Sequence, residues 1–523
     1  MPFTFNNTTN PRSMQNEPIA RPEERGRQEP TDVGDLARTT RTPLEAIFHR
    51  SMKIYFLGIC GTAMGNTAVL MKQLGHDVCG SDSQFYSPIS DLLKRHNIPT
   101  FEGFSAENLI RAEPDCVVVG NTVSRGNPEV EFLMEENAEM TSLPALLSDL
   151  LLKTRKNIVV TGTHGKTTTT TLAAFLLRKN GRFPGYLIGG IPKKLDSGVA
   201  AGISSDPFVI EGDEYDSAFF DKRSKFIHYR PNILCINNIE FDHADIFFDL
   251  RDVLRTFTHV TRLVPASGAI VINGDDANIA RLPLATWTQT VRVGLGDTCD
   301  LQIRHFSENS QGSSFELYWR GQLWTRVSWS MVGLFNVRNA AMAALSAGLS
   351  IFPQNPTLLN LSALSQFQGV KKRQEVLFTD DDTVLIEDFG HHPTAIQQTL
   401  QSLRARYPQH RIVACFEPRS NTARSNCLQS DFENALMAAD TIYLSPVYAS
   451  NRLEQPLDTR QMAQKLTLCG REAMALSHNN DLLTLLKPPM NNTLVVFFSN
   501  GSFDGIPQKV RCELMNAPKE VVC

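Results

Sequence analysis

A glycine-rich turn between an apolar strand and a helix is the feature that most limits what this chain can fold into. Residues 158–160 predict a buried strand, residues 161–167 read Thr-Gly-Thr-His-Gly-Lys-Thr, and residues 172–177 predict a helix. Such a turn presents backbone N–H groups and a helix N-terminus to phosphates. Lys166 then reaches the terminal phosphates, and the Thr167 hydroxyl can hold Mg²⁺. Because the first glycine of the general pattern GxxxxGK[ST] would fall at Val160, this is a shortened, narrower version of the loop.

Length and charge exclude several classes of protein. A chain of 523 residues is too long for one core, so two or three domains are expected. The net charge of -4 argues against a general binder of nucleic acid or of membrane surfaces. No apolar run approaches the ~20 residues that span a bilayer. The ten cysteines are scattered without a CxxC pair, which favours reduced thiols in a cytoplasm.

Four segments follow from the composition and the periodicity. Residues 1–51 are polar, and we expect a disordered extension that buries too little apolar surface to fold. Residues 52–150 predict a Rossmann-like domain, residues 151–368 a central domain with the phosphate loop, and residues 369–523 a second Rossmann-like domain. The predicted fold class is therefore α/β, in three domains dominated by parallel sheets.

The first domain opens with a strand over residues 53–57 and a turn that contains Gly58, Gly61 and Gly65. A helix and a strand ending in Ser81-Asp82 follow. An acid about 20 residues after the glycines is typical of dinucleotide sites, but the GxGxxG spacing is broken here. An oxidoreductase, a nucleotide-sugar site and a structural turn all remain open at this point.

Alternation of apolar and polar residues places further elements in the other two domains. An antiparallel excursion is predicted over residues 301–329 and a helix over 336–349. The predicted parallel strands cover residues 208–211, 233–238 and 269–273 in the central domain, and 383–388, 411–416 and 493–498 in the third.

Two side chains at strand ends are candidate metal ligands. Glu211 ends a predicted strand in the domain of the phosphate loop, where Mg²⁺ is usually held. The following acids, Asp213, Glu214 and Asp216, fit a solvated acidic turn better. His243 follows another strand end, so a ligand of a second metal ion and a structural histidine are both open.

In their order along the chain, six signals resemble the ATP-dependent Mur ligases of peptidoglycan synthesis and recycling. They are the TGTxGKTT loop, Glu211, residues 238–243 (Asn-Ile-Glu-Phe-Asp-His), residues 333–339, Arg373 and residues 387–393 (Glu-Asp-Phe-Gly-His-His-Pro). Two departures stand out. The family usually has histidine at the position of Phe335, and no lysine occurs from 226 through 370 to supply the carbamoylated lysine of some members.

The resemblance implies ATP and Mg²⁺ as cofactors and an acyl-phosphate route to an amide. It implies catalytic roles for Lys166, Glu211, His243 and Arg373, with Thr167, Glu211 and His243 as metal ligands. The implied ATP-binding residues are Gly162, Thr163, His164, Gly165, Lys166, Thr167, Thr168, Asn336, Asn339, Arg373 and Asp388. Those implied for a UDP-sugar are Gly58, Gly61, Gly65, Ser81 and Asp82. His391 or His392 is a candidate base for the attacking amine or a positioning group.

Residues 214–226, 241–247 and 417–422 resemble the members that join a murein tripeptide to UDP-N-acetylmuramate. Arg419, Asn421, Lys222 and Arg223 would then meet the carboxylates of the peptide, although a solvated basic turn is an equal interpretation of the last two. The alternative is the ligase that adds L-alanine to the same sugar nucleotide. Other classes are an NAD-dependent oxidoreductase with an appended ATPase and a nonenzymatic nucleotide switch. A bacterial cytoplasmic enzyme with no nucleic-acid, membrane or obligate protein partner is expected.

Overall fold

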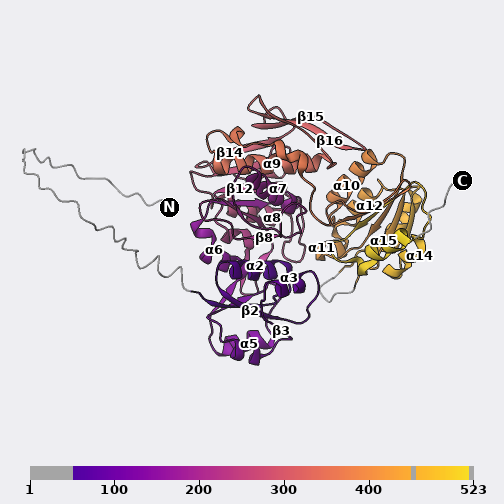
Figure 1. The fold of residues 1–523 in the computed structure, drawn as a ribbon. Helices are drawn as coiled ribbons and strands as arrows, with labels where there is room; N and C mark the ends of the chain where they lie inside the picture. Colours follow the sequence, from indigo (N-terminus) through magenta and orange to yellow (C-terminus); the bar gives the residue numbers. More distant parts are fainter. Residues whose placement is uncertain (1–50, 449–454, 517–523) are drawn as a thin grey trace, which may run out of the picture. The chain divides into compact units, whose positions relative to one another are not determined.

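The protein was analysed as a computed structural model that describes residues 51–448 and 455–516. The extension expected over residues 1–51 lies outside these residues, except for Ser51. The described residues belong to one unit that is built on three main sheets (Figure 1).

The first sheet contains five parallel strands in the order β3-β2-β1-β4-β5. They are β1 (Lys53–Leu57), β2 (Asp77–Asp82), β3 (Thr100–Glu102), β4 (Cys116–Val119) and β5 (Met140–Ser142). The helices are α2 (Thr62–Gln73), α3 (Ile89–Arg95), α4 (Ala106–Ala112), α5 (Pro128–Glu135) and α6 (Leu143–Leu150). β1 is buried on both faces, as expected for the centre of a parallel sheet.

The central sheet has ten strands in the order β17-β16-β15-β14-β13-β12-β6-β9-β7-β8. Its parallel part comprises β6 (Asn157–Thr161), β7 (Gly185–Leu187), β9 (Phe208–Gly212), β12 (Ile233–Ile236), β13 (Ala269–Asn273) and β14 (Gln289–Gly294). The antiparallel strands are β8 (Val199–Ala200), β16 (Gly312–Trp319) and β17 (Gln322–Trp329), with β15 (Leu301–Asn309) at the transition. The antiparallel excursion predicted over residues 301–329 is confirmed.

Helices cover both faces of the central sheet. Ile158 and Val160 pack with α7 (Lys166–Lys179) and α9 (Leu334–Ile351), whereas Val159 packs on the opposite face with α8 (Leu250–Thr261). A separate hairpin joins β10 (Asp216–Ala218) and β11 (Asp221–Ser224). α7 begins with five threonines that are poor helix formers, and their burial in the core offsets this low propensity.

The third sheet has the order β18-β19-β23-β20-β21-β22. Its strands are β18 (Glu375–Thr379), β19 (Thr383–Asp388), β20 (Arg411–Phe416), β21 (Thr441–Leu444), β22 (Glu472–Ala475) and β23 (Thr493–Phe498). The helices are α10 (Pro393–Arg406), α11 (Asn421–Arg424), α12 (Gln429–Leu436), α13 (Thr459–Leu468), α14 (Leu482–Leu485) and α15 (Ile506–Asn516). All neighbours are parallel except β18, which pairs antiparallel with β19 at the edge.

The three main sheets consist mostly of parallel strands and are accompanied by helices, which confirms the predicted α/β class. Among residues 51–448 and 455–516, no helix is long and apolar enough to cross a membrane. The nine cysteines in these ranges are all free thiols, and six of them are buried.

Candidate active site

The phosphate loop connects β6 to α7 through two glycines with left-handed backbone. Gly162 has φ 130° and Gly165 has φ 80°. A Cβ at Gly165 would lie 2.4 Å from Oδ1 of Asn339, so neither the conformation nor the space admits another residue. Asn238, which follows β12, also holds the loop, because its Oδ1 accepts a hydrogen bond from the His164 N–H at 2.7 Å. α7 then begins at Lys166, with its N-terminal N–H groups facing the same side as the loop.

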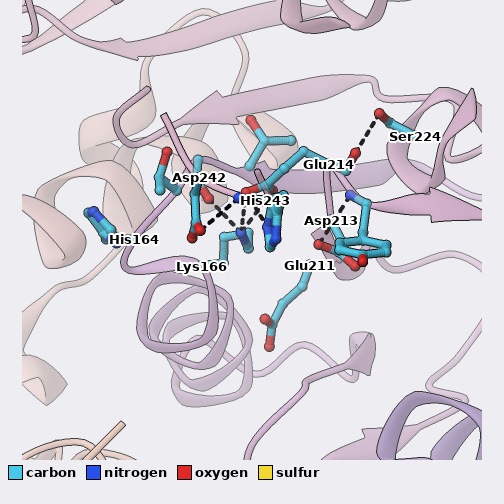
Figure 2. A network of polar contacts seen from close by, with 12 residues as sticks. His164, Lys166, Glu211, Asp213, Glu214, Ser224, Asp242 and His243 are labelled. Carbon is cyan, nitrogen blue, oxygen red and sulfur yellow. Dashed lines mark hydrogen bonds and ion pairs between the residues drawn. The ribbon is translucent and has the colours of Figure 1, made fainter. Parts of the chain in front are cut away.

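Lys166 lies in a buried network of charges. Its Nζ is 2.8 Å from Oε2 of Glu214 and donates to the carbonyl of Gly162 at 2.7 Å. Oε1 of Glu214 is 3.3 Å from Nε2 of His243, and Figure 2 shows the three side chains gathered in one network. Burial disfavours the charged imidazole, but the Glu214 carboxylate outweighs this effect and raises the pKa of His243 to about 9.

The interpretation of the 213–216 segment as a solvated acidic turn is wrong. The Glu214 side chain is 3% exposed, and Asp216 is also buried. The β10–β11 hairpin folds back over the turn, so that Ser224 donates to the carbonyl of Glu214 at 2.6 Å. These carboxylates survive burial because Lys166, Lys222 and His243 pair with them.

Glu211 and Thr167 form a second polar pair beside the network. The Thr167 hydroxyl donates to Oε2 of Glu211 at 3.0 Å, and the Gly189 N–H donates to Oε1 at 2.5 Å. In Figure 2 the Glu211 carboxylate points away from Lys166 and Glu214. Burial raises the pKa of Glu211. A hydroxyl and a half-buried carboxylate on one side of a phosphate loop are oxygen donors of the kind that Mg²⁺ prefers, so the residues fit this ion.

Arg373 reaches this place from the third domain. Its Nη2 lies 3.4 Å from the Thr167 hydroxyl, and its guanidinium lies 4.2 Å from the ring centroid of Phe389. Asp388 accepts from the N–H groups of Gln374 and Gly390, each at 2.7 Å. Burial raises the pKa of Asp388, and the nearby Arg373 charge opposes this shift. Arg373 therefore lies beside the start of α7, and both residues line the same cavity as Lys166.

A cavity of about 630 Å³ opens between these groups. Its wall includes Asn66 of α2, the phosphate loop, and the β19–α10 segment of the third domain. Phe335, where histidine was expected, also lines it. Twelve of the candidate residues line this one cavity: Thr163, His164, Gly165, Lys166, Thr167, Thr168, Glu211, His243, Asn336, Asn339, Arg373 and Asp388.

The glycine turn of the first domain lies at the end of β1. Gly58 has φ 87°, and the Cys60 N–H donates to Oδ2 of Asp82 at 2.8 Å. Ser81 is fully buried, and its hydroxyl donates to Glu129 at 2.6 Å, so this side chain braces the interior. Gly65 belongs to α2, where a Cβ would lie 2.4 Å from Cγ2 of Ile89. Helix packing accounts for Gly65 without a ligand.

The candidate peptide residues fall into two groups. In the hairpin, Lys222 pairs with Asp216 at 2.6 Å and Arg223 pairs with Asp221 at 2.8 Å. In the segment that follows β20, Nη1 of Arg419 lies 3.8 Å from Oε1 of the buried Glu417. The guanidinium of Arg419 is also 5.0 Å from the ring centroid of Tyr448.

Asn421 opens α11 and reaches the central domain. It donates to Oδ2 of Asp245 at 2.7 Å, and Asp245 also accepts from the Tyr215 hydroxyl. The Ala244 N–H donates to the hydroxyl of Thr422 at 3.1 Å. The three stretches 214–226, 241–247 and 417–422 therefore meet at one contact between the central and third domains.

Sequence reasoning missed several groups that shape the site. Asn237 donates to the Thr169 hydroxyl at 2.9 Å, and Asn238 holds the phosphate loop. Phe389 carries Arg373 on its ring face. The available signal for the asparagines was their position directly after β12, because β12 pairs in parallel with β6 and the two strands end together.

Comparisons with known proteins agree along the whole described unit. Residues 53–155 match a model described as Mur ligase family, catalytic domain; residues 160–347 match the Mur ligase middle domain; residues 372–501 match the Mur ligase, glutamate ligase domain. The chain is 38% identical over 463 residues to the UDP-N-acetylmuramate--L-alanyl-gamma-D-glutamyl-meso-2,6-diaminoheptandioate ligase of Escherichia coli, covering 88% of this chain and 97% of that protein. The chain belongs to the Mur ligase family.

A solved structure and a second relative are also similar to this chain over most of its length. The crystal structure of a murein peptide ligase from Psychrobacter arcticus has a TM-score of 0.68 and 33% identity, covering 90% of this chain and all of that one. The UDP-N-acetylmuramate--L-alanine ligase of Clostridium acetobutylicum is 28% identical, covering 84% of this chain and 93% of that protein. As a Mur ligase, the chain is an ATP-dependent enzyme that forms a C–N bond, and the resemblance stated from the motifs is confirmed.

Proposed function

We propose that this Mur ligase joins the tripeptide L-alanyl-γ-D-glutamyl-meso-diaminopimelate to UDP-N-acetylmuramate at the expense of ATP, in peptidoglycan recycling. The observation that carries the proposal is the 38% identity to the Escherichia coli tripeptide ligase over 97% of that enzyme. Relatives named as L-alanine ligases reach 28 to 31%. The free thiols of the described residues are consistent with action in a reducing cytoplasm.

The reaction needs the muramoyl carboxylate to acquire a good leaving group. Transfer of the γ-phosphoryl group of ATP to a carboxylate oxygen gives an acyl phosphate and ADP. The amine of the tripeptide then attacks the acyl carbon, the C–N bond forms, inorganic phosphate leaves, and the amine loses a proton. The first step depends mainly on alignment and neutralisation of charge.

The buried cations of the cavity suit that first step. We assign the β- and γ-phosphates of ATP to Lys166 and the N–H groups of the loop from Gly162 to Thr168. We assign Arg373 to the charge that spreads over the transferred phosphoryl group, because its guanidinium lies beside Thr167 and over the ring of Phe389. Asn336, Asn339 and Asp388 would hold the rest of the nucleotide.

Thr167 and Glu211 would hold one Mg²⁺ and His243 would serve a second metal site, and such ions when bound neutralise charge on the phosphates. The Glu214 carboxylate is the group that fixes the His243 ring through Nε2. Since the same carboxylate pairs with Lys166, it would orient a phosphate-binding cation and a metal ligand together.

The two remaining substrates would bind at the flanking domains. The turn from Gly58 to Gly61, with Asp82 bracing it, would receive the diphosphate of the sugar nucleotide. Gly65 and Ser81 would act through packing. Arg419 and Asn421 would meet the tripeptide, with Lys222 and Arg223 at the edge of the hairpin. We propose domains over residues 52–150, 151–368 and 369–523, with a hinge at Gly369, whose φ is 81°.

The test is release of inorganic phosphate by the purified chain with ATP, Mg²⁺ and UDP-N-acetylmuramate. The tripeptide should support turnover and give a conjugate of the summed mass less one water, whereas L-alanine should not. Turnover with L-alanine alone would replace the proposal by the alternative ligase. NADH bound at the first domain, without binding of the sugar nucleotide, would point to the oxidoreductase class.

A further inference from the structure

Two histidines and a glutamate from distant parts of the chain meet outside the Lys166 network. His164 belongs to the phosphate loop, Glu240 follows β12, and His392 caps α10 in the third domain. Nε2 of His164 and Nδ1 of His392 each lie 3.1 Å from the same oxygen, Oε2 of Glu240. The centroids of the two imidazole rings are 4.6 Å apart, and the ring planes are tilted by 48°.

The hydrogen bonds of His392 determine which of its nitrogens carries the proton. Nε2 lies 3.2 Å from the carbonyl oxygen of Phe241, which can only accept, so Nε2 is protonated. Nδ1 accepts from the N–H of Thr394 at 3.4 Å as the cap of α10. Burial and the adjacent His164 lower the pKa of His392 to about 4, which keeps this ring neutral.

This tautomer leaves an uncompensated contact. With Nε2 protonated and the ring neutral, Nδ1 and Oε2 of Glu240 are both acceptors and lie 3.1 Å apart, and the only hydrogen bond to Nδ1 within the described residues is the long 3.4 Å contact from the N–H of Thr394, which a bound ion would replace. The His392 side chain is 7% exposed and that of Glu240 is 26% exposed, so water screens the contact little. Two facing acceptors at this distance repel each other unless a cation lies between them.

A divalent transition metal satisfies the three donors together. All three ligand atoms lie within 4.8 Å of one another. Two ligands bound to Zn²⁺ at about 2.0–2.1 Å in a tetrahedron are about 3.3 Å apart. The two imidazole nitrogens each lie 3.1 Å from Oε2 of Glu240, close to this spacing. The bond from Nε2–H of His392 to a backbone carbonyl is also the outer contact that metal-bound histidines usually make.

We propose that His164, Glu240 and His392 form a Zn²⁺ site that joins the phosphate loop of the central domain to α10 of the third domain. Two imidazoles and a carboxylate are a ligand set that suits zinc and leaves a fourth position for water. Because His164 and Glu240 belong to the central domain and His392 caps α10 of the third domain, a bound ion holds the third domain against the phosphate loop. The site is separate from Thr167, Glu211 and His243.

The experiment measures Zn²⁺ binding to the full chain by equilibrium dialysis in the presence of excess Mg²⁺, with no substrate. The expected result is one tightly held Zn²⁺ per chain and a higher melting temperature. His392→Asn should weaken binding on the order of 100-fold while an asparagine still caps α10. His164→Ala is the second variant, should the first lose its fold. His243→Ala is the matched control and should retain the ion.

Two outcomes would overturn the site. One is wild-type protein that retains no Zn²⁺ after dialysis. The other is Zn²⁺ that survives His392→Asn and His164→Ala but is lost in His243→Ala, because the ion then sits among Asp213, Glu214 and His243, the other cluster of this kind in the described part of the chain. Neither measurement requires ligase turnover, so failure here leaves the proposed function untouched.

Discussion

Nζ of Lys166 lies 2.8 Å from Oε2 of Glu214, inside a site where both side chains are largely buried. Removing one partner of a buried pair leaves the other charge without compensation. Glu214→Gln should therefore lower the free energy of unfolding by roughly 3 kcal/mol, which thermal unfolding would show. A nonhydrolysable ATP analogue with Mg²⁺ should restore part of the loss, because phosphates then pair with Lys166.

The matched control for Glu214 is Asp216→Asn in the same turn. Asp216 pairs with Lys222, whose side chain is 70% exposed, so water screens that pair and its loss should cost much less. If Glu214→Gln and Asp216→Asn lowered the free energy of unfolding equally, the Lys166–Glu214 pair would stabilise the fold no more than the Asp216–Lys222 pair.

A second prediction concerns Arg373, a residue of the third domain whose positive charge lies beside Thr167. Arg373→Ala should lower kcat on the order of 10³-fold, because an arginine beside the transferred phosphoryl group stabilises its charge in the transition state. The kcat of Arg373→Lys should fall between those of the wild type and Arg373→Ala, since lysine keeps the charge but loses the contact of the guanidinium with the Phe389 ring. Rapid-quench measurement of ADP formation in the first turnover checks both variants; an unchanged rate in Arg373→Ala would remove it from the chemistry.

The elements around the phosphate loop were predictable because their signals are local. The strand over residues 158–160, the two glycines and Lys166 stand within a dozen residues, and period and turn chemistry suffice to place them. Central strands of all three sheets were found in the same way, but the short buried strands β7 and β21 were not predicted. The edge strand β18 was not predicted, since its partly exposed sequence over Glu375–Thr379 lacks a continuous apolar run.

The missed part of the site depends on contacts between distant segments. Glu214 looked solvated because nothing in its neighbourhood reveals that a hairpin covers it and that Lys166, 48 residues earlier, pairs with it. His164 and His392 are farther apart still and meet only because two domains pack together. Secondary-structure propensity and residue spacing predict neither the burial of Glu214 nor the contact of His164 with His392, because both arise from tertiary packing.

A third prediction concerns Asp245, which ties the loop carrying His243 to two other segments. It accepts from Tyr215 and from Asn421, and His243 itself has φ 57°, a conformation that needs outside support. Asp245→Ala should release the loop, raise the Mg²⁺ concentration needed for half-maximal rate, and lower kcat about tenfold. A Mg²⁺ titration of turnover measures this. Phe248→Ala, at an 89% exposed side chain nearby, should change neither value.

A fourth prediction concerns Glu129, which is fully buried in the first domain. Its carboxylate accepts from Ser81 at 2.6 Å, Asn108 at 2.8 Å and Tyr55 at 3.1 Å. Glu129→Ala leaves these buried donors without an acceptor and should lower the free energy of unfolding by about 3 kcal/mol. Since Ser81 adjoins Asp82, the KM for UDP-N-acetylmuramate should rise more than the KM for ATP. Glu131→Ala, on the same helix but at the surface, is the control and should leave both KM values unchanged.

The last prediction concerns acid stability at Asp221. The Arg223 guanidinium is the main reason that the pKa of Asp221 falls to about 2, and burial opposes it. A lowered native pKa stabilises the fold above the unfolded value of about 3.9, and this stability disappears as the pH falls toward 2. Because the Arg223 side chain is 64% exposed, solvent screening reduces the contribution to about 1 kcal/mol. Asp221→Asn should thus melt below wild type at pH ~7, and the gap should narrow between pH ~4 and ~2. A gap that stays constant over that range would mean that the charge of Asp221 does not stabilise the hairpin.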